Sequence, residues 1–206
     1  MTIRLHRGDL PDTFRPAAVV AIDTETLGLN PHRDRLCLVQ LSNGDGDAEL
    51  VQIQAGASAQ TAPNLVRLLS DPAVVKLFHF ARFDVAVLQR TFGVTTAPIF
   101  CTKIASRLVR TYTDRHGLKD LVRELLGVDL SKQQQSSDWA AETLTDAQMA
   151  YAASDVLYLH ACKDKLEAML AREGRQDLAQ SCFTFLPTRA ALDLAGWGEE
   201  DIFAHS

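Results

Sequence analysis

Short apolar runs separated by turn residues dominate the first part of the chain, which is the pattern of β-strands. Apolar and β-branched residues are concentrated in three early runs, at residues 17–24, 35–42 and 48–53. Residues 43–47, NGDGD, lie between the second and third runs, and Asn-Gly and Asp-Gly pairs favour the tight turns of antiparallel hairpins. The pattern therefore predicts a sheet that opens with three strands, the last two of which form a hairpin.

Helical and strand-like segments then follow one another. Leucines recur at helical spacing in residues 62–71, and a short apolar run of strand type follows at 73–80. Residues 81–92 again have helical spacing and end at Gly93, a residue that favours helix termination. Residues 98–102 are predicted to form one more short strand.

The second half of the chain is predicted to be mainly helical. Residues 115–130 carry an amphipathic helix, and the polar residues 131–142 indicate a loop. Thr145 and Gln148 are three positions apart and match a capping box, from which one long helix is expected to run to about Arg172. Strands followed by helices favour an α/β fold in which a mixed sheet is flanked by helices.

The chain length predicts one domain with an extension. With 206 residues and 47% hydrophobic content, the chain can bury the core of a single domain. We expect this domain in residues 1–172 and a C-terminal extension in residues 173–206. The extension is rich in aromatic residues but too short to enclose a core, so it should pack on the domain or on a neighbouring subunit. Because aromatic residues are enriched at interfaces, we favour a homo-oligomer.

Composition narrows the kinds of partner. The formal net charge of −5 argues against a protein that holds a long nucleic acid through many phosphates, but it does not exclude a short one. No apolar run approaches the roughly 20 residues of a membrane span, and the N-terminus lacks the apolar core of a signal peptide. We therefore expect a cytoplasmic protein without membrane contact. The four cysteines lie far apart, which predicts reduced thiols rather than a zinc site or disulfides.

Two carboxylates stand where the first predicted strand ends. Asp23 and Glu25 are two positions apart, and side chains alternate across a strand, so both point to the same face. Like charges this close repel, so that one must take up a proton or both must share a cation. An isolated Asp-x-Glu more often has one exposed carboxylate and one that caps a turn, and other residues must decide between these readings.

Three later residues bear on this choice. Asp84 falls in the first turn of a predicted helix, where the helix dipole favours a negative charge. Tyr151 and Asp155 are four positions apart on the late helix and share one of its faces. In the predicted fold Asp23, Glu25, Asp84 and Asp155 would converge. Oxygen ligands in this number favour Mg²⁺ or Mn²⁺, and two such ions about 3.5–4 Å apart suit displacement at phosphorus.

These motifs resemble those of the DEDD exonucleases of ribonuclease H-like fold, in the tyrosine-bearing branch that includes ribonuclease D. The stretches DTE at 23–25, HFARFD at 79–84 and YAASD at 151–155 match the three motifs of that family in order. The flanking stretches 117–139 and 144–159 also match, and the resemblance covers about residues 15–172. It implies a single 3'-5' exonuclease domain of ribonuclease H-like fold.

The resemblance also implies roles for individual residues. The four carboxylates would hold two divalent cations, Mg²⁺ or Mn²⁺, and Tyr151 would orient or help to deprotonate the attacking water. Leu29 is expected to enter between the last two bases, as a leucine at the corresponding place does in oligoribonucleases, although a core leucine is an equal alternative. His79 and Phe80 are further candidates for substrate contacts, and core packing is the main alternative for Phe80.

The length and C-terminal sequence are similar to the compact bacterial nanoRNase C family, whereas ribonuclease D carries additional helical RNA-binding domains. This similarity implies hydrolysis of very short RNAs, above all dinucleotides, to nucleoside 5'-monophosphates by a ring-like homo-oligomer. One alternative is a general 3'-5' exonuclease that trims longer RNA or single-stranded DNA. The other is a catalytically silent nucleic-acid-binding or scaffold protein of the same fold.

Overall fold

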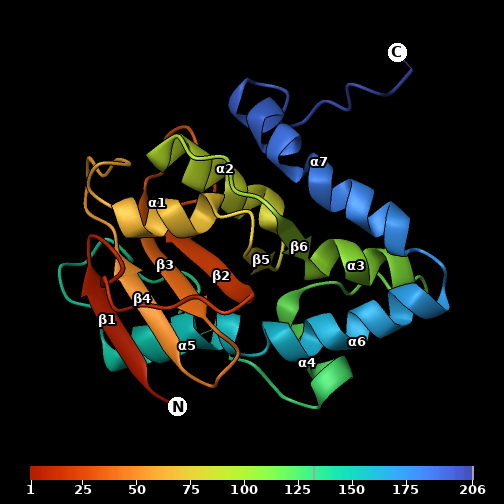
Figure 1. Cartoon of the computed structure of the whole chain (residues 1–206), viewed down its shortest axis with the longest axis horizontal. Helices are drawn as coiled ribbons and strands as arrows, with labels where there is room; N and C mark the ends of the chain where they lie inside the picture. Colours follow the sequence, from red (N-terminus) through yellow and green to blue (C-terminus); the bar gives the residue numbers. More distant parts are fainter. Residues whose placement is uncertain (132, 206) are drawn as a thin grey trace.

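A computed structural model describes residues 1–131 and 133–205 of the chain. In this range the strands form one mixed sheet in the order β1-β4-β3-β2-β5-β6 (Figure 1). The strands are β1 (Ile3–Arg7), β2 (Val19–Thr26), β3 (Leu36–Ser42), β4 (Ala48–Gln52), β5 (Val75–Phe78) and β6 (Ile99–Cys101). The helices are α1 (Pro63–Ser70), α2 (Ala81–Phe92), α3 (Thr102–Val109), α4 (Leu118–Leu126), α5 (Asp146–Leu157), α6 (Leu159–Arg172) and α7 (Gln176–Leu194).

Strand β2 lies inside the sheet and pairs with two different neighbours. It is antiparallel to β3 and parallel to β5, with Ala21 opposite Leu77. Parallel strands end at the same edge of a sheet. The residues that follow Ala21 and those that follow Leu77 therefore lie close together, although they are far apart in the sequence. The predicted hairpin of β3 and β4 is confirmed.

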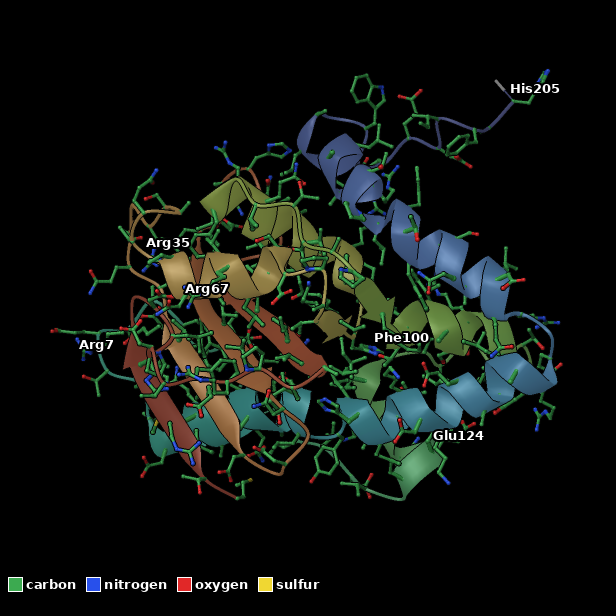
Figure 2. All side chains as sticks on the ribbon, viewed as in Figure 1. Arg7, Arg35, Arg67, Phe100, Glu124 and His205 are labelled. Carbon is green, nitrogen blue, oxygen red and sulfur yellow. The ribbon has the colours of Figure 1, made fainter. Side chains whose placement is uncertain are left out.

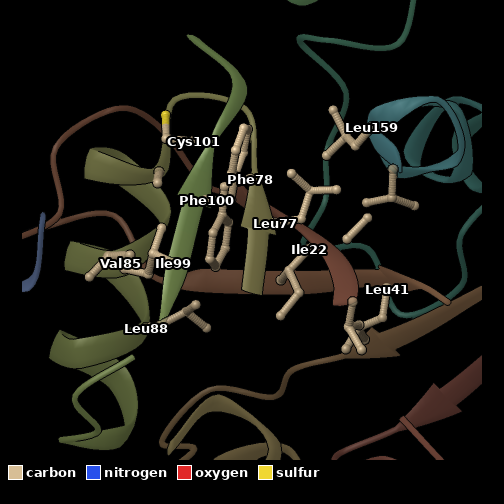
Figure 3. Packing of buried hydrophobic residues seen from close by; sticks show 14 of the residues in the cluster. Ile22, Leu41, Leu77, Phe78, Val85, Leu88, Ile99, Phe100, Cys101 and Leu159 are labelled. Carbon is tan, nitrogen blue, oxygen red and sulfur yellow. The ribbon is translucent and has the colours of Figure 1, made fainter. Parts of the chain in front are cut away.

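Helices cover both faces of the sheet. Figure 1 shows α1 and α2 on one face and α5 on the other. In Figure 3, Ile99 of β6 lies beside Val85 and Leu88 of α2, while Leu77 of β5 lies on the side of Leu159, the first residue of α6. All five side chains are buried. The core thus fixes β5, β6, α2 and α6 relative to one another, and the predicted α/β fold is confirmed.

The late helix is interrupted, which the sequence pattern did not predict. In place of one helix up to Arg172, α5 ends at Leu157 and α6 begins at Leu159, with Tyr158 between them. The backbone N–H of Tyr158 points to the carbonyl oxygen of Val156, so the regular helical hydrogen bonding stops there. The break has a tertiary cause, since α5 packs under the sheet whereas α6 packs on α3 and α4. The capping box at the start of α5 is present as predicted.

Strand β1 was also missing from the predicted sheet. It pairs parallel to β4 at one edge, with Ile3 opposite Ala48. Its outward residue Arg4 donates to Asp47 at 2.9 Å and to Glu49 at 2.7 Å, so ion pairs add to the backbone pairing along this edge. A strand held in this way has a weak hydrophobic signal, which explains why the apolar pattern did not indicate it.

The tail forms the long helix α7, which contains Pro187 and which the sequence did not predict. Helix α7 packs on α2, and Phe183 contacts Phe100 of β6 with ring centroids 4.7 Å apart. Beyond α7 the chain leaves the body of the molecule, and Figure 2 shows His205 at its far end. Phe203 in this last segment is 76% exposed.

Two expectations drawn from composition can be compared with the fold. None of the four cysteines forms a disulfide in the described structure. Among the helices in the described ranges, none combines the length and the apolar character that crossing a bilayer requires.

Candidate active site

Three carboxylates converge where β2 meets α5. Asp23 and Glu25 lie in the last half of β2 and point to the same face, as their spacing predicts. Helix α5 packs on β2 and brings Asp155 to them. Each of the three residues offers a carboxylate oxygen, and these oxygens all lie within 4.8 Å of one another. The sequence prediction that these groups meet is therefore correct.

Asp84 approaches the same place from another element. It lies in the first turn of α2 and is 3% exposed. Thr24, between the two carboxylates of β2, donates its hydroxyl to Asp84 at 2.7 Å. Asp84 is outside the cluster of three, but it lines the same cleft, and its charge raises the pKa of Asp23.

The electrostatics of the site are unfavourable in the absence of a cation. Burial, followed by the charges of the neighbouring carboxylates, raises the pKa of Asp23 well above its usual range. The same two causes raise the pKa of Glu25 to about 9, and burial raises the pKa of Asp84 and of Asp155 to about 7. Within residues 1–131 and 133–205 none of these carboxylates forms an ion pair with a lysine or arginine.

This set of donors fits a divalent cation. Carboxylates that repel one another and have no basic partner gain most from a positive ion placed among them. The ligand atoms are all oxygens, which suit Mg²⁺ or Mn²⁺ better than the nitrogen and sulfur ligands of a zinc site do. The acidic metal-binding cluster inferred from the sequence is thus present in the fold.

Tyr151 completes this wall of the cleft. It lies one turn before Asp155 on α5, on the same face of the helix. Burial and the nearby carboxylates raise the pKa of Tyr151 further above its ordinary value, so the phenol keeps its proton and acts as a donor. The ring packs against Trp139, with centroids 6.1 Å apart.

Two residues of this wall were not singled out from the sequence. Trp139 lies in the polar segment 131–142, yet it is only 2% exposed and lines the cleft beside Tyr151. Gln40 is fully buried in β3 directly opposite Asp23, with Nε2 3.5 Å from an Asp23 oxygen. Each interrupts its local pattern, since one is a lone aromatic in a polar loop and the other a polar residue in an apolar strand.

Leu29 is on the surface of the cleft. Its side chain is 85% exposed, which excludes the alternative of a core leucine. The loop that carries it is held by Asp34, whose carboxylate accepts from the backbone N–H of Asn30 at 3.0 Å. A side chain at Gly28 would collide with this carboxylate. The loop therefore presents an unsupported leucine next to the acidic cluster.

Phe80 is exposed as well, so core packing does not account for it. The residue precedes α2 in a left-handed conformation with φ 69°, which is strained for a bulky side chain. Its ring is 44% exposed, and the ammonium nitrogen of Lys103 lies 4.1 Å from the ring centroid. One face of the ring is thus beside a cation, and the residue lines the cleft.

His79 lines the cleft with a ring nitrogen that has no partner. The Thr102 hydroxyl donates to the carbonyl of Phe78 at 3.2 Å, so the contact of 2.9 Å between this hydroxyl and His79 Nδ1 requires the proton on Nδ1. His79 Nε2 is buried and has no hydrogen bond in the described structure. Burial lowers the pKa of His79 to about 3, which keeps the ring neutral.

All eight site residues predicted from the sequence therefore line one cleft of about 670 Å³. The four carboxylates and Tyr151 come from β2, α2 and α5. The three substrate candidates come from the loop after β2 and from the β5–α2 junction. The cleft thus combines a cation-binding wall with exposed apolar groups.

The chain is similar to known nucleases over this whole region. The sequence pattern of the 3'-5' exonuclease family matches residues 10–171. A ribonuclease D of Acidiphilium cryptum is 38% identical over 168 residues, which are 82% of this chain and 42% of that protein. The chain spans less than half the length of this curated relative.

Two solved structures match along the full length of both chains. Brucella melitensis NrnC with bound Mg²⁺ is 62% identical with a TM-score of 0.94, and the coverage is 100% of each chain. The same protein bound to pGG is 63% identical with a TM-score of 0.95, again over 100% of each chain. The resemblance inferred from the three motifs is confirmed. The chain belongs to the 3'-5' exonucleases, in the branch that includes ribonuclease D.

Proposed function

We propose that the protein is a metal-dependent 3'-5' exoribonuclease that hydrolyses very short RNAs, above all dinucleotides, to nucleoside 5'-monophosphates. The observation that carries this proposal is the cleft itself, in which four carboxylates and a protonated tyrosine face an exposed leucine. The likeness to NrnC, whose solved structures contain Mg²⁺ or pGG, supports both the cation and the size of the substrate.

The residues of the acidic wall have distinct tasks in this proposal. Asp23, Glu25, Asp84 and Asp155 would hold two divalent cations, Mg²⁺ or Mn²⁺. When bound, such ions supply the positive charge that activates water and stabilises the leaving oxygen at a phosphodiester. Thr24 holds Asp84 in place through its hydroxyl. Tyr151 donates a hydrogen bond and orients the attacking water, a task that requires the phenol to lie within hydrogen-bond reach.

The three substrate candidates, Leu29, Phe80 and His79, would bind the substrate in this proposal. Leu29 is placed to enter between two bases, because it is exposed and no neighbouring side chain covers it. The open face of Phe80 offers a surface for a base or a sugar, and Lys103 above the ring adds a positive charge for phosphate. His79 lines the cleft beside Phe80 and is proposed to contact the substrate, but not through Nε2, which is buried.

The division of the chain and its assembly are also proposals. Residues 1–172 would form the exonuclease domain and residues 173–206 the extension, whose exposed side chains Trp197, Ile202 and Phe203 suit contact with another subunit. A homo-oligomer, with a ring as one form, would cover these side chains.

Chain length is the test of this proposal. The assay measures turnover of 5'-phosphorylated RNAs of two, three, five and twenty nucleotides with Mg²⁺, with Mn²⁺ and with a chelator, and resolves every product. We expect fast cleavage of the dinucleotide, little of the longer RNAs, and none with chelator. Equal cleavage of all lengths would replace the proposal by the general exonuclease. Inactivity on all four would favour the scaffold.

Leu29→Ala should impair substrate binding without affecting the fold. The substitution removes an exposed side chain, so the melting temperature should stay within about 1 °C, since surface changes are usually small. We expect KM for the dinucleotide to rise about ten-fold, which corresponds to the loss of about 1.4 kcal/mol of apolar contact. Leu178→Ala, at an exposed leucine of α7 that does not line the cleft, is the matched control. An unchanged KM in Leu29→Ala would show that Leu29 does not enter between the two bases.

A further inference from the structure

Two arginines converge on one aspartate at the end of α7. Arg82, in the first turn of α2, donates from Nε and Nη2 to the two carboxylate oxygens of Asp193, at 2.6 and 2.7 Å. Arg189, one turn before Asp193 on α7, donates to the same carboxylate at 2.7 Å. The Asp193 side chain is only 12% exposed. This two-pronged pair is therefore partly shielded from solvent, unlike an ordinary surface ion pair.

The same arginines also hold the turn that follows α7. Arg82 donates to the carbonyl of Gly198 at 2.5 Å, and Arg189 donates to the carbonyl of Trp197 at 2.7 Å. The group formed by Arg82, Arg189, Asp193 and these two carbonyls is called the clamp below. It joins the end of the C-terminal extension to the beginning of α2.

The first turn of α2 is held on its inner side by the Thr24 hydroxyl on Asp84 and by the buried Ala81, and the clamp holds it on the side of α7. Phe80, which precedes it, is in a strained left-handed conformation and makes no side-chain cap. The free N–H groups of a helix start need partners, and a strained entry persists only where the surroundings hold it. Asp84 follows Arg82 by two residues in this same turn. The clamp thus acts on the segment that carries both the metal-binding Asp84 and the exposed ring of Phe80.

We propose that Asp193 is a positioning residue for the active site: through the clamp it fixes the first turn of α2, and with it Asp84 and Phe80. The inference rests on the proposed function for its kinetic part. It assigns a part in the geometry of the cleft to a segment beyond residues 10–171, which match the exonuclease family. Asp193 itself touches neither the acidic cluster nor the ring of Phe80.

The test uses Asp193→Asn, which keeps the shape of the side chain and removes its charge. Amide hydrogen exchange of residues 79–86 should become faster by about ten-fold or more, while β3 and α5 exchange at unchanged rates. On the dinucleotide, kcat should fall by about 10–100-fold, because small displacements of a reacting group reduce the rate steeply, and KM should rise because the clamp also fixes Phe80. Glu167→Gln removes a carboxylate that pairs with Lys163 on α6 and is the matched control.

Arg82→Lys is the second variant, since it keeps the positive charge but cannot form the two-pronged contact. In Arg82→Lys, amide exchange of residues 79–86 should also become faster, but by less than in Asp193→Asn. Unchanged exchange at residues 79–86 in both variants would overturn the proposal, and so would a uniform increase over the whole chain, which indicates a general loss of stability. Because exchange requires no activity, a chain that cleaves no RNA would contradict the proposed function without affecting this test.

Discussion

Asp23→Asn is expected to lower turnover of the dinucleotide by about a thousand-fold or more. Asp23 lies at the centre of the acidic cluster, where Glu25, Asp84 and Asp155 all act on it. An asparagine in its place is a neutral and much weaker ligand for Mg²⁺. Loss of one such ligand removes several kcal/mol of transition-state stabilisation, and each 1.36 kcal/mol is about ten-fold in rate. The measurement is kcat at saturating Mg²⁺.

The same substitution should make the metal-free protein more stable. Burial and the neighbouring carboxylates raise the pKa of Asp23, so the metal-free chain must protonate this side chain or bury its charge when it folds, and asparagine avoids this cost of about 1 kcal/mol or more. We expect the melting temperature in chelator to rise by about 2–4 °C. Asp164→Asn, at an exposed position of α6, changes the net charge equally and should alter neither quantity. A fall in melting temperature of Asp23→Asn would show that the aspartate supports the fold rather than the chemistry.

Tyr151→Phe is expected to reduce kcat by about a hundred-fold or more. The phenylalanine keeps the ring against Trp139 and removes only the hydroxyl that lies near Asp155. Correctly placed proton donors and acceptors contribute about 10²–10⁴-fold to a rate. KM should change little, because the hydroxyl acts on water rather than on the bases. Single-turnover kinetics with the dinucleotide measure this step directly.

The control for Tyr151 lies on the same part of the chain. Tyr158, between α5 and α6, does not line the cleft, and Tyr158→Phe should leave kcat unchanged. Both variants should unfold within about 1 kcal/mol of the original protein, the usual worth of one hydrogen bond. A Tyr151→Phe protein with full activity would assign the orientation of water to the carboxylates alone.

Local patterns predicted the elements that carry the motifs. The apolar runs of β2, β3 and β5 are continuous in the sequence, and the acidic pair of β2 follows from strand alternation. The break at Tyr158 has no glycine or proline to mark it, and β1 has few apolar residues and depends on its pairing with β4. These features depend on neighbours distant in the sequence, so no local pattern could predict them.

The candidate site, too, was predicted only in part from the sequence. The family motifs included Asp84, whose position depends on the meeting of β5 and β2 at one edge of the sheet. Sequence spacing could not place Phe80, since nothing local indicates a left-handed residue before a helix. The contact between Arg82 and Asp193 joins positions 111 residues apart, and neither residue belongs to a recognisable motif.

The order in which the carboxylates occur along the chain links activity to the completion of folding. Asp23 and Asp155 belong to β2 and α5, and Asp84 comes from α2, so no contiguous fragment brings them together before the sheet and both helix layers have formed. A cation that binds only the native chain stabilises it by mass action, by about 2.7 kcal/mol at a hundred times its dissociation constant. A partly folded chain has no assembled site, so the proposed activity would begin only when these elements are in place.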